Sequence, residues 1–324
     1  MTLAPYLKKF STLTEQISLL ESRGMVVADH AQAEACLSRI GYYRLSAYMY
    51  PFRLRENEGG KVVVRDSYYG TPNFEDVINF YIFDKNLRLM VSDALERIEV
   101  TLRADVAQRL GAVDPLAHRD AAKLDGNFSK KMSRRPGRTH LTLHADWLQS
   151  QDDTFSRSRE DFAKHFSNKY SGFPPIWIAT EAWDWGTLSN FYPGMKAADR
   201  NAIAARYGKL TSPEMEAWVR AMNDVRNVCA HHSRLWNRGL KVTLKWPVVG
   251  LMPTLDHIHG EPHSLSRLYG VLVAMVTIMK VVHPNTKWHE RIRDFVLGHA
   301  PAHPAIDCST AGFPKGWEKE AIWH

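Results

Sequence analysis

One stretch of the sequence, from Thr211 to Arg238, combines a strong helical pattern with a cluster of chemically active side chains. Thr211 and Glu214 have the spacing of a capping box, and Pro213 falls in the first turn, so a helix is predicted to begin here. Gly239 follows the stretch, where a left-handed residue commonly ends a helix. A long helix with a defined start and end therefore constrains the fold of the chain around it.

Placed on a helical wheel at about 100° per residue, the stretch separates into two faces. The apolar face, which is suited to packing, comprises Trp218, Ala221, Met222, Val225, Val228, Cys229 and Trp236. The opposite face spans about 160° and carries Arg220, Asn223, Asp224, Arg226, Asn227, His231 and Arg234. One helix is thus predicted to present a cation, an amide, an imidazole and a carboxylate side by side.

The two neighbouring histidines separate on this wheel. His231 falls near Asn227 and Asp224, whereas His232 projects toward the apolar face. We therefore interpret His231 as the chemically active histidine, with Asp224 in support, and His232 as a packing residue and a secondary candidate for support. This interpretation assumes a regular helix through both histidines.

The residues from Arg226 to His231 resemble the R-N-x-x-x-H signature of HEPN ribonucleases, and the continuation to Arg238 is similar to the Abi family of bacterial abortive-infection proteins within that superfamily. Three further stretches carry the narrower resemblance. They are Ile40–Tyr48 with Pro51 and Phe52, Arg97–Glu99, and Pro175–Trp177 followed by Glu181, Trp183 and Gly186–Ser189. Together these stretches follow the order of the family.

The resemblance implies an all-α fold: a HEPN-like helical bundle with extra N-terminal and C-terminal helices and at most one small β-hairpin. It also implies an endoribonuclease of antiphage defence, a toxin that an RNA or protein antitoxin would restrain. HEPN domains pair so that their motifs face each other across a cleft. Because one R-N-x-x-x-H string occurs in this sequence, a homodimer with two Arg226 and two His231 around one phosphate is expected.

These residue types suit RNA cleavage without a metal ion. The 2′-hydroxyl of RNA is an internal nucleophile, so cleavage needs a base, an acid and a cation at the phosphate. Histidine suits the proton transfers because its unperturbed pKa lies near 6.5, and arginine donates to phosphate in a fork. Arg226, Asn227 and His231 are therefore the predicted catalytic residues, with no cofactor and no metal.

Net charge favours an acidic partner, with nucleic acid first. The formal charge is +7, although a mildly basic enzyme without a polyanionic partner has a similar balance. Residues 130–138 form the most basic run, and Pro136 and Gly137 predict a loop there, either a phosphate clamp or an ordinary solvated loop. The candidate RNA-binding residues are Arg44, Arg97, Arg103, Lys130, Lys131, Arg134, Arg135, Arg138 and Arg234.

Several other functional classes have little support. Three widely spaced cysteines indicate a reducing environment, and no secretory leader or membrane-length apolar run is recognised, so a cytoplasmic protein is expected. Cys229 and His232 have helical spacing for one ion, but no second Cys/His pair completes a zinc site. P-loop and nucleophile-elbow motifs were not found.

The order of helical and turn signals predicts a modular chain. Short helices are expected over 12–24 and 29–41, a hairpin within 56–69, and helices over 74–110, 141–169, 265–282 and 286–297. The apolar run 268–282 is expected to be a buried core helix, and the apolar, aromatic stretch 176–192 is suited to packing beside the helix that begins at Thr211. We divide the chain softly into a helical lobe (1–70), a HEPN-like domain (71–300) and an irregular tail (301–324). The alternative function is a non-catalytic, dimeric RNA-binding module; a DNA-binding regulator is a weaker third reading.

Overall fold

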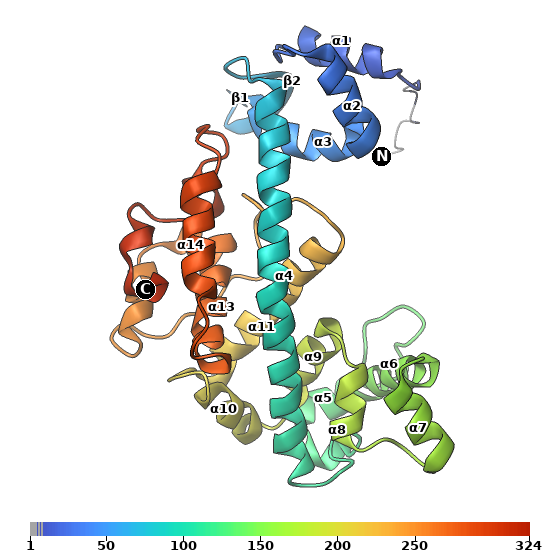
Figure 1. The fold of residues 1–324 in the computed structure, drawn as a ribbon. Helices are drawn as coiled ribbons and strands as arrows, with labels where there is room; N and C mark the ends of the chain where they lie inside the picture. Colours follow the sequence, from blue (N-terminus) through green and yellow to red (C-terminus); the bar gives the residue numbers. More distant parts are fainter. Residues whose placement is uncertain (1–4, 6, 8) are drawn as a thin grey trace. The chain divides into compact units, whose positions relative to one another are not determined.

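The computed structural model describes residues 5, 7 and 9–324, and in this part of the chain it shows helices and one two-stranded hairpin (Figure 1). The prediction of an all-α fold with a small hairpin is confirmed. The chain divides into two compact units: residues up to Leu87 with Gly298–Thr310, and Arg88–Leu297 with Ala311–His324. The sequence placed a soft boundary near residue 70. The division lies instead inside helix α4, where no Gly or Pro interrupts the helical pattern.

The elements follow in chain order. The first unit contains α1 (Leu13–Ser22), α2 (His30–Ile40), α3 (Tyr42–Met49), β1 (Arg53–Glu58), β2 (Lys61–Tyr68) and the beginning of α4 (Phe74–Gly111). The second continues α4 and holds α5 (Gly126–Lys130), α6 (Leu143–Arg157), α7 (Asp161–Lys169), α8 (Ile176–Ala179), α9 (Trp185–Phe191), α10 (Ala197–Ala205), α11 (Ser212–Ala230), α12 (Pro262–Leu265), α13 (Leu268–Val282) and most of α14 (Trp288–His299).

Local signals explain the elements of the first unit. The Glu15 carboxylate accepts from the Thr12 backbone N–H at 2.7 Å, which completes the predicted cap of α1. Asp29 caps α2. The two-residue turn between β1 and β2 is Gly59-Gly60, with φ of 58° and 84°, as the common hairpin turn requires. These sequence predictions are confirmed.

The aromatic stretch after α2 divides between core and surface. Tyr48 and Phe52 are buried, and the Tyr48 hydroxyl donates to the buried Asp84 carboxylate at 2.8 Å. Tyr43 and Arg44 are exposed on α3. Packing therefore accounts for part of the stretch, and an RNA contact by Arg44 stays a prediction.

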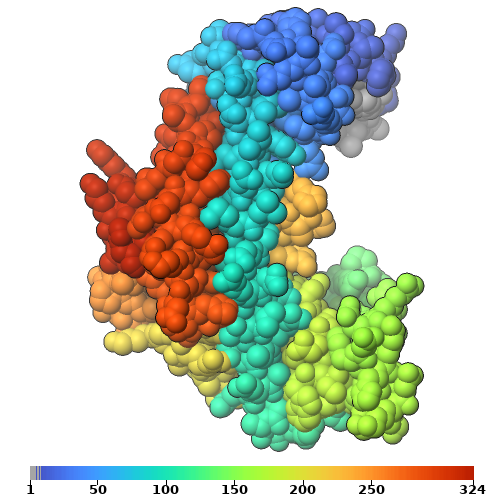
Figure 2. All heavy atoms as spheres, viewed as in Figure 1, coloured from blue at the N-terminus to red at the C-terminus, as the bar shows by residue number. Residues whose placement is uncertain are grey.

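Helix α13 forms the centre of the second unit. Its residues from Leu268 to Met279 are buried, as its apolar sequence predicted. The indole of Trp288 in α14 donates to the Met90 carbonyl in α4 at 2.9 Å, and Figure 2 shows the α14 surface directly against α4. The segment predicted as an irregular tail forms 3-10 turns. Its aromatic side chains are buried: Phe313, Trp317 and Trp323.

A buried carboxylate links α4 to the segment before α11. Asp105 is 4% exposed. It accepts a hydrogen bond from the Tyr207 hydroxyl at 2.5 Å and pairs with Arg206. Farther along α4, Arg109 pairs with Asp199 of α10 at 2.7 Å. These contacts hold the start of α11 against α4.

A buried histidine makes the fold sensitive to acid. His118, in the turn after α4, is 2% exposed, and burial lowers its pKa to about 4, with the Arg119 charge adding to the effect. His144 donates from Nε2 to the His118 carbonyl at 2.8 Å. The fold therefore stabilises the neutral form of the His118 ring.

Acidification from pH 6.5 to 4 is expected to lower the free energy of unfolding by about 3 kcal/mol through His118 alone. The unfolded chain binds the proton first, because its histidine pKa stays near 6.5. The stability that neutral His118 contributes to the fold is therefore complete above pH 6.5 and is lost as the pH falls toward 4. Urea unfolding at a series of pH values measures it. In the His118→Asn variant the free energy of unfolding should fall less steeply with decreasing pH than in the wild type. In His140→Asn, a substitution at an exposed position, it should fall as steeply as in the wild type. Equal slopes in all three proteins would show that His118 does not cause the acid sensitivity.

Candidate active site

The start of α11 forms as its sequence predicts. The Glu214 carboxylate accepts from the Thr211 backbone N–H at 2.7 Å and from its hydroxyl at 2.9 Å, and Pro213 lies in the first turn. The predicted apolar face is buried, with Val228 half-buried at its edge. The buried apolar residues are Met215, Ala217, Trp218, Val219, Ala221, Met222, Val225 and Cys229. The helix is therefore fixed in the second unit by its packing face.

The end of α11 differs from the prediction. The last helical residue is Ala230, and His231 is the capping residue. The backbone N–H of His232 donates to the Cys229 carbonyl at 3.0 Å, and that of Ser233 donates to the Val228 carbonyl at 2.9 Å. His232 has φ of +54°, the left-handed conformation that glycine usually supplies in this helix-ending motif.

The expected continuation of the helix to Arg238, with Gly239 as its stop, is wrong. Leu235 and Trp236 are 3% and 0% exposed, and the Trp236 ring lies against that of Phe313 with centroids 5.4 Å apart. The chain leaves its helical path and places these two side chains in the core. Burial of a large aromatic side chain outweighs one more helical turn.

Both histidines lie exposed at this turn. The prediction that His232 packs into the core is wrong, because the helix ends before it. His231 keeps its predicted relation to Asn227, since its backbone N–H donates to the Asn227 carbonyl at 3.0 Å. The two residues therefore stay one turn apart at the same end of α11.

Three polar side chains form a chain of contacts on the exposed face of α11. Arg226 donates from Nη1 to Asn227 Oδ1 at 3.3 Å. The Asn227 amide donates in turn to Asn223 Oδ1 at 3.4 Å. All three are half-buried. Asn227 therefore contacts the Arg226 guanidinium and also lines a pocket.

Glu99 of α4 completes the charge environment of Arg226. Burial raises the pKa of the Glu99 carboxyl, while the charges of Arg103 and Arg226 lower it and that of Asp184 raises it. Arg103 pairs with Glu99 at 3.8 Å. The charges of Arg103 and Arg226 therefore favour the ionised form of this partly buried carboxyl.

A small pocket of about 140 Å³ opens beside the end of α11. Asn227 and His231 line it, together with Arg238 and Lys241 from the following loop. Arg226 does not line it, although Asn227 joins the pocket to Arg226. An amide, an imidazole and two cations around one hollow can bind an anionic group and exchange a proton with it.

Asp224 also lines this pocket but faces the loop. Its Oδ1 lies 3.8 Å from the Lys241 amine, and its Oδ2 is buried without a hydrogen-bond partner among the described residues. No hydrogen bond between Asp224 and the His231 ring occurs in the described part of the chain. An orienting role of Asp224 toward His231 therefore stays a prediction.

The predicted RNA-binding residues lie in different settings. Arg103 donates from Nη1 to three backbone carbonyls, of which Trp183 is nearest at 2.9 Å, so its head group is engaged within the fold. Arg97 pairs with Asp93 at 2.8 Å. Arg138 pairs with Asp146 at 2.9 Å. Of the remaining ones, Arg234 is half-buried, and the others are exposed (Arg44, Lys130, Lys131, Arg134, Arg135).

Sequence reasoning missed part of this site. Glu99 entered only as part of the family resemblance, and nothing in the helical pattern connects it to Arg226. Arg238 and Lys241 reach the pocket because the chain turns back after α11, and the Arg267 guanidinium holds the Asn237 carbonyl of that turn at 3.1 Å. No local sequence signal reveals such a turn.

Within residues 5, 7 and 9–324, no group of three or more His, Cys, Asp or Glu side chains is placed to hold a metal ion. In the same part of the chain, no helix combines the length and apolar character needed to cross a bilayer.

Comparison with known proteins places the chain in a family. No curated protein and no solved structure matches the chain. A family model described as Abi-like protein matches residues 35–237. The match covers more than half of the chain, and it includes α11 with Arg226, Asn227 and His231. The chain belongs to the Abi-like protein family.

Proposed function

We propose that this protein is a metal-independent endoribonuclease of the HEPN type that acts in bacterial abortive-infection defence. Membership of the Abi-like family supports the defence role. The arrangement at the end of α11 supports the chemistry: Asn227 contacts Arg226 at 3.3 Å and lines one pocket with His231. This single arrangement carries the proposal.

The proposed reaction uses the RNA as its own nucleophile. A histidine removes the proton of the 2′-hydroxyl, the 2′-oxygen attacks the phosphorus, and the bond to the 5′-oxygen breaks as that oxygen receives a proton. Arg226 stabilises the charge on the phosphate, and Asn227 positions the guanidinium. The products are a 2′,3′-cyclic phosphate and a 5′-hydroxyl.

A homodimer would supply the groups that one chain lacks. A single His231 cannot act as base and acid in the same step, whereas a second copy facing it provides both. The exposure of His231 at the end of α11 leaves it accessible to such a partner. An RNA or protein antitoxin would restrain the toxin in the cell.

The test is cleavage of RNA by the purified full-length protein in excess EDTA. We expect cleavage at an unchanged rate, fragments with 2′,3′-cyclic phosphate and 5′-hydroxyl ends by end-specific sequencing, and a dimer by solution mass. Cleavage that vanishes with the chelator, or 3′-hydroxyl ends, would overturn the metal-independent mechanism.

The second candidate is a dimeric RNA-binding module without activity. The observation in its favour is that the His231 ring forms no hydrogen bond within the described part of the chain, so no partner orients it as a base. Under this alternative, wild-type protein binds RNA without cleaving it. The assay above separates the two functions.

A further inference from the structure

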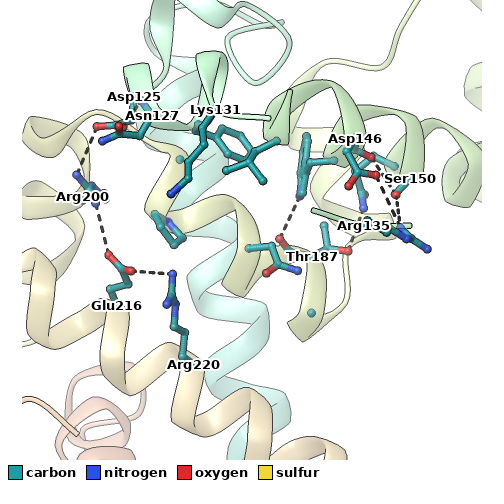
Figure 3. Close-up of a pocket in the computed structure, with 18 of the residues that line it drawn as sticks. Asp125, Asn127, Lys131, Arg135, Asp146, Ser150, Thr187, Arg200, Glu216 and Arg220 are labelled. Atoms are coloured by element: carbon teal, nitrogen blue, oxygen red, sulfur yellow. Dashed lines mark hydrogen bonds and ion pairs between the residues drawn. The ribbon is translucent and has the colours of Figure 1, made fainter. Parts of the chain in front are cut away.

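A second, larger cavity lies in the second unit, outside the candidate active site. Its volume is about 860 Å³, within the range of small-molecule sites. Residues of α6, α9 and α11 and of the segments around α5 and α10 line it (Figure 3). None of Arg226, Asn227 and His231 is among its lining residues.

Arginines already neutralise most of the carboxylates in this cavity. Arg200 lies between Asp125 at 3.8 Å and Glu216 at 3.5 Å, and Glu216 also pairs with Arg220 at 2.9 Å. Figure 3 shows this row of ion pairs along one wall. Its acidic members are therefore not free to repel an anion.

On the opposite wall of the cavity, a carboxylate is again paired with arginines. Asp146 pairs with Arg138 at 2.9 Å and lies 3.8 Å from Arg135. It also accepts from the Ser133 hydroxyl at 2.7 Å. The Arg135 side chain is 60% exposed, so its remaining donors are open to a ligand.

One cation in the cavity has no counter-ion. Lys131 is exposed, and no carboxylate of the described residues lies within 4.0 Å of its amine. Figure 3 shows its side chain extending into the space between the Arg200–Glu216–Arg220 row and Thr187. Arg220 on α11 pairs with Glu216 but its side chain is 50% exposed, and the lining carboxylate Asp184 accepts from the Thr187 backbone N–H at 2.8 Å. Lys131 therefore supplies the unpaired positive charge, and Arg220 offers further donors, toward an anionic group.

Neutral hydrogen-bonding groups complete the lining. Gln151 donates to the Thr187 hydroxyl at 2.9 Å, and the Trp147 indole donates to the Thr187 carbonyl at 3.2 Å, so both side chains of α6 are bonded to α9. Asn127 and Asn190 also line the cavity. Amide side chains of this kind match the donor and acceptor edges of nucleobases.

We propose that this cavity binds a nucleoside phosphate, with Lys131, Arg220 and Arg135 at the phosphate and the amides at the base or ribose. The ligand is either a free nucleotide or a nucleotide of an RNA chain. The inference goes beyond the proposed ribonuclease and does not require cleavage, because it concerns binding at residues outside the candidate active site.

Calorimetric titration of the full-length protein tests this inference with three probes: AMP, a tetranucleotide with 2′-O-methyl groups, and inorganic phosphate. The methyl groups block the 2′ nucleophile, so the result does not depend on RNA cleavage. If AMP binds, the ligand of the cavity is a free nucleotide. If the tetranucleotide binds and AMP does not, the ligand is a segment of RNA. Either result supports the site.

The Lys131→Ala variant should weaken binding of the nucleotide probe about tenfold or more, because it removes a charge-assisted contact. Lys164→Ala is the matched control: Lys164 is an exposed lysine of α7 that does not line the cavity, so binding should change less than about twofold. Equal weakening by both variants would overturn the site, as would absence of binding to AMP and tetranucleotide. Phosphate binding as tight as AMP binding would overturn the nucleoside assignment.

Discussion

Replacing His231 by alanine is expected to lower the rate of RNA cleavage by about 100-fold or more, the usual contribution of a general acid or base. His231 lines the pocket at the end of α11 with Asn227, and its ring is exposed rather than packed. The substitution should therefore leave the fold and the affinity for RNA nearly unchanged. Single-turnover cleavage and RNA binding, measured on the same samples, separate the two effects.

His232→Gly is the matched control for this experiment. It removes the neighbouring imidazole, which does not line the pocket, and glycine adopts the φ of +54° found at this position without strain. We expect an unchanged cleavage rate in this variant. An equal loss of cleavage in both variants, or full activity of His231→Ala, would remove His231 from the mechanism.

Replacing Asp105 by alanine is expected to reduce the free energy of unfolding by about 2–4 kcal/mol. The Asp105 carboxylate accepts from the Tyr207 hydroxyl at 2.5 Å and pairs with Arg206. Its loss leaves a buried hydroxyl without its acceptor and opens a gap between α4 and the segment before α11. Urea denaturation followed by tryptophan fluorescence measures the change.

Asp93→Ala on the same helix serves as the comparison. The Asp93 side chain is 42% exposed and pairs with Arg97 at 2.8 Å, so water replaces the lost partner and the expected change is below about 1 kcal/mol. Similar effects of the two substitutions would show that the Asp105 contacts do not hold α11 against α4.

Local sequence signals predicted the elements that depend on neighbouring residues. The cap of α1 at Thr12, the hairpin turn at Gly59-Gly60 and the start of α11 at Thr211 all form as expected. Each involves backbone groups within a few residues, so short-range chemistry decides it. The burial of α13 was equally predictable, because its sequence is apolar on all sides except at a few positions such as Lys280, and a run of this length is too short to span a bilayer.

The sequence predicted the part of the candidate site that lies on α11, but not the part formed by the chain after α11. The wheel placed Asn227 and His231 at one end of the same helix, and this relation holds. The wheel also predicted that His232 packs into the core and that the helix continues to Arg238. Both expectations are wrong, because periodicity could not show that Leu235 and Trp236 would be buried by a turn of the chain.

The sequence by itself determined the helical fold class, the hairpin and the position of the Arg226–His231 motif, because these follow from periodicity, caps and spacing along the chain. Only the tertiary structure decided where α11 ends and that Glu99 lies in the charge environment of Arg226. It also decided that Lys131 and Arg220, far apart in sequence, line one cavity. Contacts between distant segments depend on how the whole core packs, and no local pattern encodes them.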